Sequence, residues 1–302
     1  MRLNQIRVFL AVVESGSIRA AARSLEVSPP AVSKSLRQLE EELRVRLLER
    51  TQHGVVTTPA GRAFVARARV IRSELRKAEE EFAQFSGDGA GSVAIGVGPT
   101  EMILIVPDAL AEFRQQLPRA RVRIVEGRRP AWLPLVRDET LDFAVGLRPE
   151  GKLDSGLAFR PLFRSDFVVA ARKGHPLRNA RSLAQLAGAE WLTLAPRSQS
   201  AGLLEQAFSL AGLPAPPPPM IECESFNGIV AVVARTDMLT LVAHRLLAMP
   251  FARDLLQEIP VAEKFPPVTH GIFTNAHAPL TRTAAAMLKA VSAVARKHAR
   301  GE

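Results

Sequence analysis

The chain has 302 residues, of which 47% are hydrophobic and 23% are charged, a balance typical of a folded globular protein with two or three domains. No apolar run approaches the roughly 18 residues of a membrane helix, and the first residues lack the apolar length and cleavage site of a signal peptide. The single cysteine, Cys223, excludes an internal disulfide. We therefore expect a cytoplasmic protein that does not contact a membrane.

The positive charge is concentrated near the N-terminus. Residues 1–77 contain 15 Lys and Arg against 7 Asp and Glu, whereas the other residues are nearly balanced and the whole chain carries +10. A basic domain joined to a nearly neutral one predicts a polyanionic partner for the first and a different task for the second. Charge alone is equally compatible with a basic, solvated surface.

Three helical patterns begin the chain. The first covers residues 4–14 and ends at "SGS", after which Ser17 is a natural N-cap for a short Ala-rich helix. With Ser28 as the next N-cap, Pro29 and Pro30 fall at the first two positions of a third helix, where their missing N–H groups cost no helical hydrogen bond. Two helices joined by a tight turn, the second starting with small polar and basic side chains, are typical of a helix-turn-helix that enters the major groove.

The motifs of this segment go beyond helix spacing. The stretch "GSIRAAARSLEVSPPAVSKSLRQLEEELRVRLLERT", followed by "GVVTTPAG", resembles the N-terminal domain of LysR-type transcriptional regulators. The matching features are the AA pair after GS, the S-x-P-A-V-S helix start, LEEEL, the L-x-x-R-T strand and the T-x-x-G before the next helix. The resemblance implies an N-terminal all-α winged helix-turn-helix over residues 1–58, with "LLERTQHGVVTT" as a two-stranded wing that approaches the DNA.

The expected contacts to double-stranded DNA lie at the start of the third helix and in the wing. The family usually has Gln at the place of Pro29, and that amide commonly reads a base. Proline cannot donate a hydrogen bond, so we expect base readout to shift toward Ser33, Lys34 and Arg37. A helical hairpin with merely solvated polar residues is the alternative. The candidate DNA-binding residues are Ser28, Pro29, Pro30, Ser33, Lys34, Arg37, Arg50, Gln52 and His53.

A long helix is predicted over residues 59–86, before a Gly-rich hinge at 87–91. Its apolar residues follow a 4-3-4-3 spacing, which is a heptad seam and predicts a dimerising coiled-coil linker. An amphipathic helix packed on its own chain is the alternative. A homodimer would place two recognition helices on the half-sites of a near-palindromic operator, and the resemblance adds that such dimers often form tetramers. The seam residues are Phe64, Ala68, Ile71, Leu75, Ala78, Phe82 and Phe85.

Short apolar runs then alternate with helical patterns along residues 92–302. "SVAIGVG", "RVRIVEG" and "DFAVGL" read as strands separated by helices, which predicts a mainly parallel α/β sheet. The order resembles the LysR-type effector domain, which has a two-lobed fold like that of a periplasmic binding protein. The predicted parts are lobe I at 92–162 and 268–302, lobe II at 163–267, and crossover strands near 161–166 and 265–269.

The resemblance implies an effector in the cleft between the lobes. "GVGPTE" and "APRSQSAG" each end a strand and open a helix, with Thr100 and Ser198 as candidate caps, and the N–H groups of such helix starts favour an anion. Capping alone is the competing interpretation. We expect a small carboxylate or sulfonate. The candidate effector-binding residues are Gly98, Pro99, Thr100, Glu101, Ser198, Gln199, Ser200, Phe226, Asn227 and Thr240.

No catalytic, cofactor-binding or metal-binding motif stands out. Gly96 and Gly98 form half of a dinucleotide fingerprint, but Glu101 occupies the place of the third glycine. The six histidines and Cys223 lack metal-ligand spacing, and no G-x-S-x-G occurs. We therefore expect no enzyme, no catalytic residue, no cofactor and no metal. A DNA-binding protein without an effector, or an enzyme fused to a DNA-binding module, stays open as an alternative.

Overall fold

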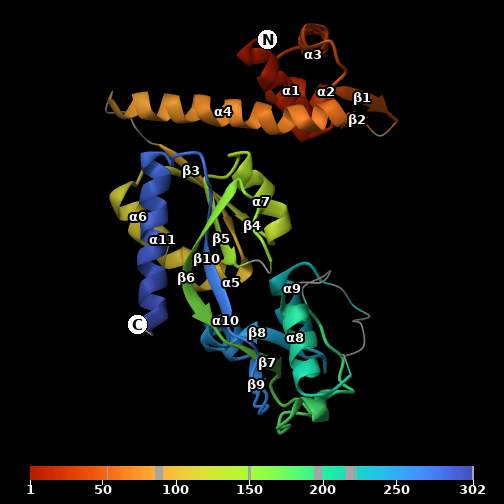
Figure 1. The fold of residues 1–302 in the computed structure, drawn as a ribbon, viewed down its shortest axis with the longest axis vertical. Coiled ribbons are helices and arrows are strands. Elements are labelled where there is room, and N and C mark those ends of the chain that lie inside the picture. Colours follow the sequence, from red (N-terminus) through yellow and green to blue (C-terminus); the bar gives the residue numbers. More distant parts are fainter. Residues whose placement is uncertain are drawn as a thin grey trace.

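The computed structural model describes residues 1–52, 54–85, 91–148, 151–193, 199–214, 221 and 223–300. An N-terminal domain, a long helix and a two-lobed region follow one another along the chain (Figure 1). In Figure 1 the long helix, α4, lies between the N-terminal domain and the first lobe.

The N-terminal domain is the predicted winged helix-turn-helix. Its core contains the fully buried Phe9, Leu10 and Leu39, which come from two different helices, and Leu47 at the start of the wing. β1 and β2 pair as an antiparallel hairpin. The elements are α1 (Leu3–Ser15), α2 (Ile18–Ser24), α3 (Pro29–Leu43), β1 (Leu48–Thr51) and β2 (Gly54–Thr57).

The long helix α4 (Pro59–Phe85) has two different environments along the predicted seam. Near its start, Ala68 is fully buried and the Phe64 ring lies 5.1 Å from the ring of Phe9, so this part packs on its own domain. Further along, Leu75 and Phe82 are 41% and 71% exposed. Packing within the chain therefore accounts for the first half of the seam and leaves apolar side chains uncovered in the second.

Lobe I contains a five-stranded sheet in the order β4-β3-β5-β10-β6. β3, β4 and β5 are parallel, and β10 runs antiparallel to both β5 and β6. Helices α6 and α11 lie on one side of this sheet and α7 on the other (Figure 1). The elements are β3 (Ser92–Val97), α5 (Pro99–Leu104), α6 (Val106–Gln116), β4 (Arg121–Glu126), α7 (Arg129–Arg137), β5 (Phe143–Leu147), β6 (Leu157–Ser165), β10 (Val268–Asn275) and α11 (Arg282–Arg300).

Lobe II is built on a three-stranded sheet in the order β8-β7-β9, in which β7 pairs antiparallel with both β8 and β9. The prediction of a mainly parallel sheet therefore holds only for β3, β4 and β5, because local patterns of apolar residues do not encode strand direction. The elements are β7 (Phe167–Arg172), η1 (Leu183–Leu186), α8 (Gln199–Leu210), α9 (Phe226–Val233), β8 (Thr240–Ala243), η2 (His244–Ala248), α10 (Pro250–Arg253) and β9 (Leu256–Ile259).

The strands β6 and β10 connect the two lobes. They pair with each other along nearly their whole length, with a register shift between His270 and Gly271. β6 stays in the lobe I sheet as far as Ser165, beyond the predicted boundary at residue 162. The two predicted crossovers therefore form one antiparallel ribbon.

The segment after β3 forms two helices where the sequence predicts one. Ile105 leaves the helical conformation, with φ −125° and ψ −47°, between α5 and α6. Pro107 follows two residues later, and a proline ring clashes with the carbonyl of the preceding turn. The break leaves α5 only six residues long.

Candidate nucleic-acid interface and ligand cleft

The first turn of α3 projects from the N-terminal domain. The Ser28 hydroxyl accepts a hydrogen bond from the Ala31 N–H at 3.4 Å, and Pro29 and Pro30 occupy the first two helical positions. All four residues are exposed. The predicted cap and helix start are confirmed, and this turn is free of packing within the described chain.

A groove of about 790 Å³ runs between α3 and the wing. Ser33, Arg37 and Arg50, three of the predicted DNA-contacting residues, line it. Arg44 and Arg46 line it as well and were missed. The signal that could have found them is the "RVR" run between the third helix and the wing.

The remaining predicted DNA contacts lie outside this groove. Lys34 and Gln52 are exposed, on α3 and in the turn of the wing respectively. His53 lies outside the described residues. The structure thus places basic side chains on both the helix and the wing.

The wing is fixed to the turn that follows α1. The Val55 N–H donates a hydrogen bond to the Gly16 carbonyl at 2.9 Å. Gly54 has φ +129°, and a Cβ there would lie 2.6 Å from the same carbonyl oxygen. Only glycine fits this close approach without strain. The contact holds the wing, in which Arg50 pairs with Val55, against the turn after α1.

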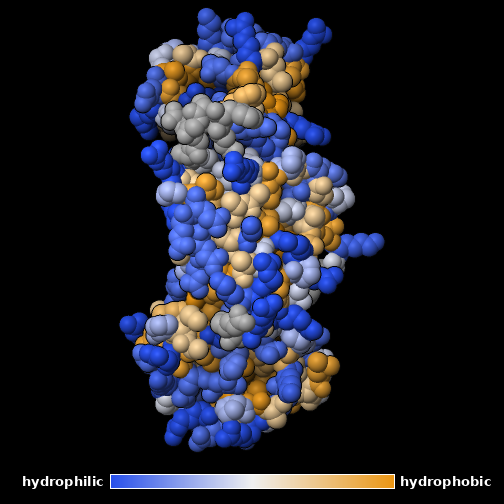
Figure 2. Space-filling model, turned by 90° about the vertical axis from the view of Figure 1, so that its left-hand side faces the viewer, coloured by the Kyte–Doolittle hydropathy of each residue, from blue (hydrophilic) through white to orange (hydrophobic). Residues whose placement is uncertain are grey.

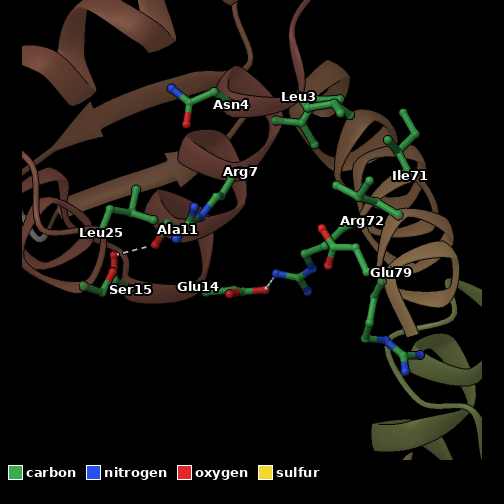
Figure 3. Close-up of a pocket in the computed structure, with 14 residues that line it drawn as sticks. Leu3, Asn4, Arg7, Ala11, Glu14, Ser15, Leu25, Ile71, Arg72 and Glu79 are labelled. Carbon is green, nitrogen blue, oxygen red and sulfur yellow. Dashed lines mark hydrogen bonds and ion pairs between the residues drawn. The ribbon is translucent and has the colours of Figure 1, made fainter. Parts of the chain in front are cut away.

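A second groove, of about 790 Å³, lies between α1 and α4. Figure 3 shows Leu3 and Ile71 on its two walls and an ion pair between Glu14 and Arg72 across it, at 2.8 Å. Leu75 also lines this groove. Figure 2 shows hydrophobic side chains at the surface of this end of the molecule.

Three ion pairs join α4 to lobe I. The three acidic partners lie close together between the end of α7 and the start of β5, and all three are buried. The ion pairs are Arg69–Asp138 at 2.9 Å, Arg76–Asp142 at 2.8 Å and Lys77–Glu139.

The carboxylate of the Arg76–Asp142 pair is the most buried of the three, because the side chain of Asp142 is only 1% exposed. Asp142 also accepts a hydrogen bond from the Ala94 N–H at 2.7 Å, and Arg76 also contacts Glu80 at 2.9 Å. Burial by itself lowers the pKa of Arg76, but the Asp142 and Glu80 carboxylates outweigh it and raise that pKa above its ordinary value. The guanidinium is therefore held in its charged form between two elements of lobe I and its own helix.

A cavity of about 340 Å³ lies between the two lobes. Six of the predicted effector-binding residues line it, four from the start of α5 and two from lobe II. The other walls are mainly apolar, with Trp132, Phe167 and Ile229 among them. The six are Gly98, Pro99, Thr100, Glu101, Phe226 and Thr240.

The other predicted effector contacts do not reach this cavity in the described part of the chain. Asn227 is exposed and absent from its lining. Ser198 lies outside the described residues, and of Gln199 and Ser200 only the helical backbone is described. Thr100 is not the predicted cap: Gly98 takes the N-cap position of α5, and Thr100 is the second helical residue.

Arg128 and Arg129 also line the cavity and were missed. They lie at the start of α7, directly after β4. The signal was present, because "EGRRPAW" repeats the arrangement of "GVGPTE", with a glycine after a strand and a proline in the first turn of a helix. Both helix starts border the same cavity.

The indole of Trp132 lines the same cavity as the starts of α5 and α7. Its Nε1–H donates a hydrogen bond to the Gly127 carbonyl at 3.1 Å. A Cβ at Gly96 or Gly146 would lie 2.9 Å or 2.8 Å from Trp132 atoms. These two glycines therefore make room for the ring, and Gly96 has a packing role rather than a nucleotide-binding one.

Among the described residues, no group of three or more His, Cys, Asp or Glu side chains is arranged to hold a metal ion. Over the same part of the chain, no helix is long and apolar enough to cross a membrane.

Comparison with known families matches both parts of the chain. The family model described as "Bacterial regulatory helix-turn-helix protein, lysR family" matches residues 3–62, and "LysR substrate binding domain" matches residues 86–296. The HTH-type transcriptional regulator TdcA of Escherichia coli (strain K12) is 30% identical over 260 residues, which cover 86% of this chain and 82% of the relative. GbpR of Azospirillum brasilense is 30% identical over 298 residues, covering 97% and 87%.

Solved structures share the fold. The crystal structure of CbnR, a LysR family transcriptional regulator, has a TM-score of 0.70 and 22% identity, and the match covers 98% of this chain and 99% of CbnR. Full-length CbnR complexed with its target DNA gives a TM-score of 0.69 at 20% identity, covering 97% and 100%. With both domains matched and relatives at 30% identity along most of its length, the chain belongs to the LysR family: it is a DNA-binding transcriptional regulator with an effector-binding domain, and not an enzyme.

Proposed function

We propose that this regulator binds a near-palindromic operator as a homodimer, and that a small carboxylate or sulfonate in the cleft changes the angle between its two DNA-binding domains. Pairing of two dimers into a tetramer belongs to the same proposal. Arg128 and Arg129 carry the argument for an anion, because both line a cavity with mainly apolar walls. In such surroundings a guanidinium binds a carboxylate more strongly than in water.

The rest of the cavity argues for an apolar body on the effector. Trp132, Phe167 and Phe226 supply aromatic surface, and Ile229 adds an aliphatic side chain. The volume of about 340 Å³ falls in the range of small-molecule sites. An aromatic or branched aliphatic acid fits these walls better than a sugar.

The anion proposal is tested by thermal shift with carboxylic acids and their uncharged amides. We expect the acids to raise the melting temperature and the amides to have little effect, because an amide cannot form a charge-assisted pair with arginine. The variant Arg128→Gln should weaken binding of every acid. Stabilisation by neutral sugars and by no anion would show the proposal to be wrong.

The assignment of the DNA contacts rests on Lys34 and Arg50, one on α3 and one in the wing, both exposed. We expect Lys34→Ala to weaken operator binding and to change the preferred base at the position it faces, by about 1–3 kcal/mol of discrimination. Arg50→Ala should weaken binding to all sequences alike and reduce the salt dependence. Mobility shifts on operator variants measure both, and unchanged footprints for both variants would contradict the assignment.

A further inference from the structure

Glu101 is a carboxylate in the wall of a cavity proposed to hold an anion. It lies in the first turn of α5, and its side chain is 1% exposed. An acidic group beside an anionic ligand would repel it, unless the ligand also brings a hydrogen-bond donor. The position of each carboxylate oxygen therefore decides what Glu101 does.

One oxygen is held inside the protein. Oε1 lies 2.5 Å from Nδ1 of His270, which is fully buried on β10. The other ring nitrogen of His270, Nε2, lies 2.5 Å from the Ser165 hydroxyl at the end of β6. The imidazole is also stacked on the Phe163 ring, with centroids 4.4 Å apart and 6° between the planes. Glu101 is thus fixed in place through both strands that connect the lobes.

The second oxygen lies beside Gly98, and both Glu101 and Gly98 line the cavity. A Cβ built at Gly98 would lie 2.4 Å from Oε2, so this oxygen lies against a residue that itself lines the cavity. No described residue donates a hydrogen bond to Oε2. A carboxylate oxygen with this surrounding is an acceptor available to a ligand.

We propose that the effector is an anion that also carries a hydroxyl or ammonium donor, with Arg128 and Arg129 binding the anionic group and Glu101 accepting from the donor. This inference rests on the proposed function and specifies its ligand class. His270 is the positioning residue, since it orients Glu101 without lining the cavity. Hydroxy acids and amino acids share this chemistry.

The test compares acids that differ only in the donor. 3-Phenylpropionate, 3-phenyllactate and phenylalanine form one series, and 4-methylpentanoate, 2-hydroxy-4-methylpentanoate and leucine form another. Calorimetric titration of the full-length protein should give at least one donor-bearing acid about tenfold or more tighter binding than its unsubstituted parent, the gain typical of a hydrogen bond to a charged group. A gain in affinity for the hydroxy acid identifies the hydroxyl as the donor, and a gain for the amino acid identifies the ammonium.

Substitutions distinguish the contact of the donor with Glu101 from the contact of the anionic group with Arg128. Glu101→Gln and His270→Gln should each reduce the ratio of affinities between donor-bearing and unsubstituted acid toward one, which loss of folding alone would not do. Arg128→Gln should lower both affinities together. If a variant fails to fold, the O-methyl ether of the better hydroxy acid provides the same test on the unmodified protein, because it keeps the oxygen but cannot donate.

The outcomes distinguish the two proposals. If unsubstituted acids bind as tightly as all their donor-bearing relatives, or the methyl ether binds as tightly as a hydroxy acid that had gained affinity over its parent, the role of Glu101 is wrong while the anion site stands. If no acid of either series binds, the anion site itself fails and this inference fails with it.

Discussion

Gly61 fixes the corner between the wing and α4. A Cβ at this position would lie 2.0 Å from the Leu47 carbonyl oxygen, and the Gly61 N–H donates to the Thr58 hydroxyl at 2.9 Å. We expect Gly61→Ala to force these segments apart and to lower the free energy of unfolding by about 1–3 kcal/mol, as overpacked sites do. Thermal unfolding of the full chain measures the change.

Gly188→Ala is the matched control for this substitution. A Cβ at Gly188 meets no atom within 4 Å, and its φ is not in the left-handed region. The control should therefore melt close to the unmodified protein. Equal melting temperatures for the two variants would contradict the close approach at Gly61.

Single residues were predictable from sequence where their partners are close in the chain. The Ser17 and Ser28 caps each accept from the N–H three residues ahead, so both partners stand in one short motif. The contact between His270 and Glu101 joins residues 169 positions apart. No local pattern contains such a pair, which is why the sequence predicted Glu101 as an effector-binding residue but not its contact with His270.

At the scale of elements, the attachment of α4 to lobe I depends on buried charge. The side chain of Asp142 is 1% exposed and that of Arg76 is 29% exposed. Asp142→Asn or Arg76→Gln leaves the other charge partly buried without its partner, so we expect each to cost about 1–3 kcal/mol. The double variant should lose less than the sum of the two, and a double-mutant cycle of denaturant unfolding measures this coupling.

An exposed pair provides the comparison. Arg137 and Asp154 lie 2.9 Å apart with side chains 54% and 46% exposed, so Arg137→Gln should cost less than about 1 kcal/mol. If Arg76→Gln is equally mild, the ion pairs do not hold α4 against lobe I.

Strand direction is a property that the apolar patterns of the sequence did not predict. The strands of both lobes have similar apolar sequences, yet β3, β4 and β5 run parallel and β7, β8 and β9 antiparallel. Direction depends on how the chain returns to the sheet, which involves residues far from each strand. The helix α4, in contrast, was predictable because its heptad spacing is local, although the spacing did not tell which half packs on its own chain.

At the scale of the whole molecule, α4 has one side tied to lobe I and another with exposed apolar residues. Leu75 is 41% exposed and lines the groove against α1. Burial of this surface by a second copy is the physical basis of the proposed dimer, so Leu75→Glu should shift the mass toward the monomer, because it would bury a charge. Light scattering over a range of concentrations measures the mass, and mobility shift measures the accompanying loss of operator affinity.

Leu210→Glu is the matched control for the dimer prediction, because Leu210 is 72% exposed on α8, in lobe II. It changes the same residue type to the same charge but lies outside the α1–α4 groove. We expect this variant to keep the mass and the operator affinity of the unmodified protein. Loss of the dimer in both variants, or in neither, would contradict an interface on α4. If the unmodified protein proved to be a monomer, two half-sites could not be read by one assembly, since a near-palindromic operator requires the second recognition helix that only a dimer supplies.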